Sequence, residues 1–242
     1  MSASMSAPVG AQRQALVEAL VVSLVVTVLV TAASAFLPDR YIATVVGFVF
    51  LGATWALVWR RDDAHVERAG LALGGLVLPG ALDGKRAARA AGVSVMWAAL
   101  LGAIFFGPFF FGWRIFWHPR GAFALHMAPL DLVNEIFGQL VIIALPEEAF
   151  YRGYLQSRLE EAMPSTIKIF GARVGPAVLV TSVIFALGHF ATIREPARFA
   201  VFFPSLVFGW LRQRTGGIGA SVAFHASCNV FSEVLGKGYR LY

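Results

Sequence analysis

Residues 130–155 read LDLVNEIFGQLVIIALPEEAFYRGYL, and this stretch decides how the chain is interpreted. It is long enough to cross a bilayer as a helix, which needs about 20 mostly apolar residues. It nevertheless contains Glu147, Glu148 and Arg152. An ionisable group at mid-bilayer costs at least about 2.5–3.5 kcal/mol, so such groups usually face the interior of a bundle or a water-filled cavity. We therefore expect a membrane helix that carries a polar site into a helix bundle.

The composition of the whole chain agrees with a membrane protein. Of its 242 residues, 58% are hydrophobic and only 14% are charged, whereas soluble domains are about 45–50% apolar and about 25% charged. This excludes a soluble globular enzyme. The apolar residues also come in unbroken runs, which disfavours a β-barrel, because barrel strands alternate apolar and polar residues. The expected fold class is all-α, a polytopic transmembrane bundle.

The apolar runs predict about seven spans, and the length allows six to eight. They lie at residues 16–37, 41–59, 90–113, 130–155, 175–193, 199–211 and 217–235. The segment 67–83 is broken by glycine and proline, so we expect it to be interfacial or re-entrant. We treat residues 1–242 as one membrane domain, in which residues 130–235 form the motif-bearing core and residues 1–129 contribute spans with no assigned role.

The net charge of +6 comes from basic residues that are scattered over the predicted loops. With a cytoplasmic N-terminus and seven spans, the cytoplasmic side collects twelve of them and the opposite side seven, when Arg152 is set aside. This excess favours an N-in, C-out orientation. No run of five or six basic residues occurs, so lipid headgroups rather than nucleic acid are the expected partners. The single cysteine, Cys228, allows neither an internal disulfide nor a cysteine-based zinc site.

Helical spacing assigns different roles to the charges of the first polar group. Glu148 and Arg152 are i,i+4 neighbours and can form a stabilising ion pair. Glu147 projects about 100° away and has no partner in its own helix. Pro146 removes a backbone donor beside it and can kink the helix. Glu147 is therefore the free carboxylate, suited to general acid or base chemistry.

Two later spans carry isolated polar groups at the same spacing. His225 and Asn229 are i,i+4 on the last span, and Phe185 and His189 are i,i+4 on the fifth. Phe185 can pack on the His189 imidazole and hold its rotamer. A carboxylate, two imidazoles and an amide from three helices could converge on one buried point, where they could activate water and bind an oxyanion. The pattern predicts hydrolysis of a peptide bond inside the membrane.

At these positions the sequence resembles the CPBP intramembrane proteases. This family includes CAAX-processing endopeptidases of the ras-converting type and bacterial bacteriocin-processing or self-immunity proteins. Its three motifs appear in order, EExxxR at residues 147–152, FxxxH at residues 185–189 and HxxxN at residues 225–229. Each motif alone is weak, but together on apolar helices they form a fairly specific signature over residues 130–235.

The resemblance implies a role for each motif residue. Glu147 and His189 would activate the hydrolytic water, and His225 and Asn229 would stabilise the oxyanion. Glu148, Arg152 and Phe185 would support the site structurally. A zinc-dependent mechanism is the alternative in such a family. The absence of HExxH and the amide rather than a carboxylate at position 229 favour a glutamic-type mechanism with no cofactor over zinc.

The resemblance also implies a substrate and a location. Similar bacterial proteins with an LPEE-type first motif are like the myxosortase group, which cleaves the C-terminal tails of surface proteins at the membrane. The expected substrate is thus a membrane-associated protein or peptide cut near its C-terminus, and the expected location is the bacterial inner membrane. A prenylated CAAX substrate is the better-known family chemistry.

Two readings compete with catalysis. The same buried polar residues could serve a non-catalytic scaffold or immunity protein, or a proton-coupled transporter. Transporters often show two repeated halves, and no internal repeat is visible here. A second i,i+4 pair of acids, Asp131 and Glu135, is expected to be solvated at the membrane edge.

Overall fold

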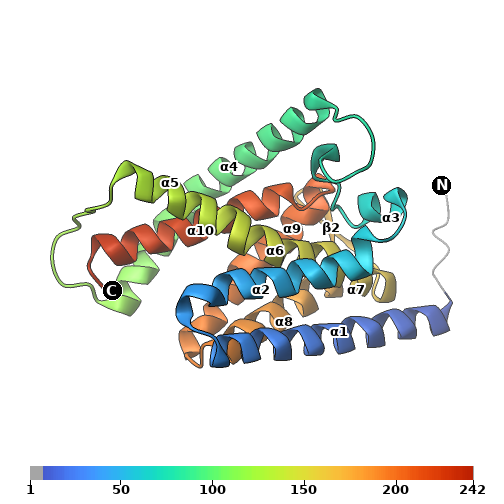
Figure 1. Cartoon of the computed structure of the whole chain (residues 1–242), viewed down its shortest axis with the longest axis horizontal. Coiled ribbons are helices and arrows are strands. Elements are labelled where there is room, and N and C mark those ends of the chain that lie inside the picture. Colours follow the sequence, from blue (N-terminus) through green and yellow to red (C-terminus); the bar gives the residue numbers. More distant parts are fainter. Residues whose placement is uncertain (1–7, 242) are drawn as a thin grey trace.

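The computed structural model describes residues 8–241, and helices make up most of it (Figure 1). Successive helices run back and forth along the long axis, so α1 begins at one end and α10 finishes at the other. The main helices are α1 (Val9–Phe36), α2 (Asp39–Thr54), α4 (Gly84–Trp117), α5 (Pro129–Phe137), α6 (Leu145–Glu148), α7 (Gln156–Ala162), α8 (Pro176–Thr192), α9 (Phe202–Thr215) and α10 (Gly219–Gly238). The predicted all-α fold class is confirmed.

Several of these helices have the length and apolar character of membrane spans. Within residues 8–241, four helical stretches qualify: Val9–Phe36, Asp39–Trp59, Gly84–Trp117 and Pro129–Ala162. The second continues α2 through a π-helical segment (Trp55–Trp59). Pro176–Thr192 is apolar but shorter. The structure supports a membrane bundle, and the count of about seven spans stays a prediction.

The broken segment before α4 folds onto the end of the bundle. It contains the short helix α3 (Asp63–Arg68) and a 3-10 turn (Leu73–Gly75). The Ile218 amide donates to the Gly70 carbonyl at 3.0 Å, and Leu71 is fully buried. The chain enters and leaves this segment at the same end, so it adds no crossing (Figure 1).

A β-hairpin that was not predicted from the sequence joins α7 to α8. Strands β1 (Ile167–Ile169) and β2 (Ala172–Val174) pair antiparallel across a two-residue turn. Three-residue strands are too short to give a clear alternation of apolar and polar residues. Trp210 of α9 ties the hairpin to the bundle, because its indole N–H donates to the Ile169 carbonyl at 2.9 Å.

The buried apolar residues form two clusters. The larger lies between α1, α2, the middle of the α5–α7 helix and α8, with Phe50 and Phe150 near its centre. The smaller joins α4, α9 and α10 through Leu101, Phe208 and Phe224. Arg152 and His225 lie between these clusters, because each contacts Phe185 of the larger cluster and Phe208 of the smaller one.

Candidate active site

The first motif lies on a helix that is widened on both sides of its two acids. A π-helical segment, η3 (Gly138–Ala144), precedes α6, and a second, η4 (Ala149–Leu155), follows it. Pro146 lies between them and lacks the N–H for an ordinary helical hydrogen bond. Widened turns of this kind are frequent at functional sites. Here the helix continues past Pro146 instead of ending.

Every residue of η4 is buried. Close packing accounts for the glycine at position 153 of η4. A Cβ at Gly153 would lie 2.6–2.8 Å from the Leu71 side chain. Such a contact is too short for any larger residue without movement. The segment before α4 is thereby packed directly against the motif helix.

Glu148 and Arg152 form the ion pair that their spacing predicts. Arg152 Nη1 lies 3.2 Å from Glu148 Oε1, and both side chains are fully buried. Arg152 Nη2 also donates to the Ser205 hydroxyl at 2.7 Å and to the Ser205 carbonyl at 3.1 Å. A buried charge is strongly destabilising when it loses its partner. Ser205 lies on α9 outside the three motifs, so the sequence reading missed it.

Glu148 has a second partner, which connects the ion pair to the last motif. His225 Nδ1 donates to Glu148 Oε1 at 2.9 Å. The imidazole also stacks on Phe208 at 4.7 Å between ring centroids with the planes 15° apart. Arg152 lies over the same Phe208 ring at 5.2 Å. For Glu148 the sequence predicted only the ion pair with Arg152. The contacts of His225 with Glu148 and Phe208 were not predicted.

Glu147 faces both histidines. Its Oε2 atom lies 3.9 Å from His189 Nε2 and 3.8 Å from His225 Nε2. Within residues 8–241 this buried oxygen makes no hydrogen bond. His189 Nδ1 donates to the Phe185 carbonyl at 3.1 Å, and the Phe185 ring packs on the His189 ring with centroids 4.3 Å apart. Both imidazoles thus use Nδ1 for the protein and turn Nε2 toward the carboxylate.

Asn229 belongs to a row of polar groups that continues through Gln139 and Glu135 to Lys237. Its Nδ2 donates to Gln139 Oε1 at 2.9 Å, and Gln139 Nε2 donates to Glu135 Oε1 at 3.0 Å. Lys237 Nζ lies 2.6 Å from Glu135 Oε2. A carboxylate only accepts hydrogen bonds, so Glu135 fixes the orientation of both amides. The amino group of Asn229 therefore faces Gln139 and has one further N–H to donate.

Of the pair expected to be solvated at the membrane edge, Asp131 is exposed, whereas Glu135 is partly buried. Its side chain is only 20% exposed and pairs with Lys237 of α10. The pairing was not predicted because Lys237 lies 102 positions away along the chain and comes beside Glu135 only through helix packing. Cys228 between His225 and Asn229 is a free thiol.

The zinc alternative depends on whether enough ligand side chains meet at one point. Within residues 8–241, no three side chains of His, Cys, Asp or Glu are arranged so that they could hold one metal ion. A protein zinc site needs at least three such ligands. The expectation that the protein needs no cofactor stays a prediction.

Comparison with known proteins adds one finding. Residues 128–231 match the family model Rce1-like, described as Type II CAAX prenyl endopeptidase Rce1-like. The matched segment begins one residue before α5, ends within α10 and contains all three motifs. Comparisons with curated proteins and with solved structures gave no match. The family match supports the resemblance to CAAX-type intramembrane endopeptidases at the general level, and with the apolar helices it supports an integral membrane protein.

Proposed function

We propose that this protein is an intramembrane endopeptidase of the glutamic type, which hydrolyses a peptide bond near the C-terminus of a membrane-associated protein. The observation that carries the proposal is the placement of Glu147 Oε2 at 3.9 and 3.8 Å from two imidazole nitrogens. These separations are too long for direct hydrogen bonds. They suit three groups that share one water molecule.

In this mechanism Glu147 is the general base. It takes a proton from the shared water while the hydroxide oxygen bonds to the scissile carbonyl carbon. His189 holds the water through Nε2, because its Nδ1 proton is committed to the Phe185 carbonyl. The protonated Glu147 then passes its proton to the leaving nitrogen as the C–N bond breaks. The products are a carboxylic acid and an amine, and the site returns to its starting state.

His225 and Asn229 are suited to the oxyanion. Glu148 lies behind His225 at 2.9 Å, and a carboxylate in this position orients an imidazole and stabilises its protonated form. A protonated His225 would donate from Nε2 to the developing O⁻. Asn229 supplies a second donor, the amino N–H that Gln139 does not use. Donors that are already oriented in a site without bulk water give the largest catalytic stabilisation.

The family match does not decide which class of substrate the protein cleaves. The two candidates are a prenylated CAAX-type C-terminus and an unprenylated C-terminal sorting tail of a bacterial surface protein. We propose the sorting tail, on the resemblance of the LPEE-type first motif to the sorting group. The enzyme would then lie in the bacterial inner membrane with a cytoplasmic N-terminus.

The test uses the full-length protein in liposomes and two internally quenched peptides, one farnesylated at a CAAX cysteine and one an unprenylated C-terminal tail. Wild type should cleave the tail, and His189→Ala should lose most of that activity. Glu161→Gln is the matched control, because Glu161 lies on α7 away from the motifs. Cleavage of the farnesylated peptide alone would overturn the sorting proposal. Loss of all activity in excess EDTA, with recovery in zinc, would overturn the metal-independent mechanism.

Cells provide the complementary test. Membrane and secreted proteins are compared between strains with and without this gene, and an uncut C-terminal tail should appear in the deletion strain. A non-catalytic scaffold, immunity protein or transporter predicts something else. If Glu147→Gln and His189→Ala both restored the deletion phenotype fully, the protein would act by binding or transport.

A further inference from the structure

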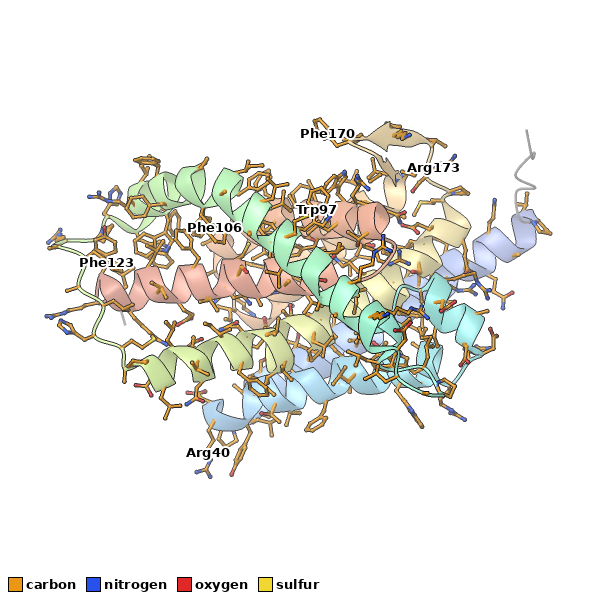
Figure 2. All side chains as sticks on the ribbon, turned by 90° about the horizontal axis from the view of Figure 1, so that it is seen from above. Arg40, Trp97, Phe106, Phe123, Phe170 and Arg173 are labelled. Carbon is orange, nitrogen blue, oxygen red and sulfur yellow. The ribbon has the colours of Figure 1, made fainter. Side chains whose placement is uncertain are left out.

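The β1–β2 hairpin, residues 167–174, combines an apolar tip with two cations and lies apart from the proposed site. Phe170 at the tip is 88% exposed, and Ile167 and Ile169 are also exposed. Lys168 and Arg173 are exposed as well. Figure 2 shows the hairpin on the flank of the bundle, with Phe170 extending away from the helices.

The turn itself contains a residue that its geometry disfavours. Phe170 has φ +44° and Gly171 has φ +83°, the left-handed values that two-residue hairpin turns require. Asn-Gly is the usual pair in such turns, because a bulky residue at positive φ is strained. Phe170 makes almost no contact that would offset this strain, as its exposure shows. Within residues 8–241 almost nothing covers the Phe170 ring, so a binding partner is needed to bury it and to offset the strain.

The two cations of the hairpin also indicate a missing binding partner. Lys168 and Arg173 are direct partners across the hairpin. Like charges at directly opposed positions destabilise a strand pair. Within the described chain neither one forms a salt bridge, whereas six other basic side chains, two of them histidines, do. An anionic group bound between them would remove the repulsion.

Two tryptophans and an arginine near the hairpin indicate that it lies at the membrane interface. Trp97 and Trp210 pack edge to face at 5.3 Å, and Arg214 lies over Trp97 at 5.6 Å. Tryptophan with nearby basic residues is typical of the headgroup level. In Figure 2, Phe170 lies near the level of Trp97 along the long axis, and Arg173 lies closer to the end where α1 begins.

We propose that this hairpin binds an anionic phospholipid. Phe170 inserts at the boundary between the headgroups and the acyl chains, and Lys168 and Arg173 together hold the headgroup phosphate. The ordering matches a membrane surface, with the apolar tip toward the bilayer centre and the cations toward the headgroups. The lipid site is independent of the proposed peptidase chemistry.

The first experiment measures the depth of the tip. The native thiol is removed by Cys228→Ala, and a nitroxide is attached to Phe170→Cys in the full-length protein in phosphatidylglycerol–phosphatidylcholine liposomes. Asp63→Cys, at the exposed start of α3, is the aqueous control. The Phe170→Cys label should collide more with oxygen than with a water-soluble nickel chelate, and the Asp63→Cys label should show the reverse. Equal nickel accessibility at the two sites would overturn the proposal.

The second experiment measures lipid selectivity. In nanodiscs of the same lipids, spin-labelled phosphatidylglycerol should be retained over phosphatidylcholine. The double variant Lys168→Gln and Arg173→Gln should lower this preference about fivefold or more, since one basic residue near an anionic surface contributes roughly that factor. The double variant Arg13→Gln and Arg61→Gln removes the same charge elsewhere and should have a smaller effect. Equal losses in both variants, or displacement of the lipid by inorganic phosphate alone, would contradict a lipid site in the hairpin.

Discussion

The lipid-facing helix α4 and the buried segment η4 show two different ways in which this sequence specifies structure. Of the 34 residues of α4, only Ala98, Leu101, Gly102 and Trp113 are buried. All seven residues of η4 are buried, Arg152 among them. On α4, apolar composition is enough, because lipid solvates its surface. On η4, the buried Arg152 takes its partner Ser205 from another helix, because a buried charge needs compensation that apolar composition cannot supply.

This difference predicts that sensitivity to mutation follows burial and charge pairing inside the bundle, and not hydrophobicity alone. Removal of one member of a buried charge pair leaves the other without compensation, whereas truncation of a lipid-facing side chain exchanges one apolar contact for another.

The largest expected effect on stability is at the buried ion pair. Arg152→Met leaves Glu148 charged and buried with only His225 as a partner, and should lower the free energy of unfolding by about 3–5 kcal/mol. Unfolding in mixed detergent micelles measures it. The control is the double variant Glu148→Gln and Arg152→Met, which removes both charges and should recover part of the loss. A single variant as stable as wild type would show that the pair is not needed.

The next effect concerns a residue that holds Asn229 in position. Gln139→Ala removes the acceptor that fixes the Asn229 amide, so kcat should fall by about 10- to 100-fold with little change in KM. Glu135→Gln should act in the same direction, because a carboxamide can donate to Gln139 and reverse its orientation. Peptide cleavage in liposomes measures both, alongside the melting temperature. An unchanged kcat in both variants would refute the positioning role of this row without affecting the assignment of Glu147.

A smaller effect is expected at Ser205. Ser205→Ala removes the hydroxyl that accepts from Arg152 at 2.7 Å but keeps the carbonyl, and should cost about 1.5 kcal/mol of stability. The matched control is Ser227→Ala, whose hydroxyl bonds only to the Ala223 carbonyl of its own helix. Equal stability of the two alanine variants would contradict a specific role for Ser205.

The sequence predicted what depends on local spacing or on composition. The Glu148–Arg152 ion pair follows from i,i+4 positions, and the membrane helices follow from apolar runs. Partners from distant segments could not be predicted in this way, because Ser205 is 53 positions from Arg152 and Gln139 is 90 positions from Asn229. No periodicity connects such positions. A serine in an otherwise apolar span was the only available signal for Ser205.

The smallest effect is expected on the lipid-facing helix. Phe111 of α4 is 67% exposed, whereas Phe150 of η4 is 1% exposed. Phe111→Ala should change the free energy of unfolding by about 0.5 kcal/mol or less, and Phe150→Ala should lower it by about 3–5 kcal/mol. The two variants make the same chemical change and are measured together in micelles. Similar losses at both positions would show that α4 is also specified by packing.

The central claim is that Glu147 is the base that activates water between two imidazoles. Its most direct test is the rate at which Glu147→Gln cleaves a quenched C-terminal peptide in liposomes, with Glu161→Gln as a control for loss of charge. The amide keeps the shape of the side chain but is a poor proton acceptor. We expect the rate to fall by at least about 100-fold while the control retains wild-type activity. A Glu147→Gln rate within a few-fold of wild type would contradict the claim.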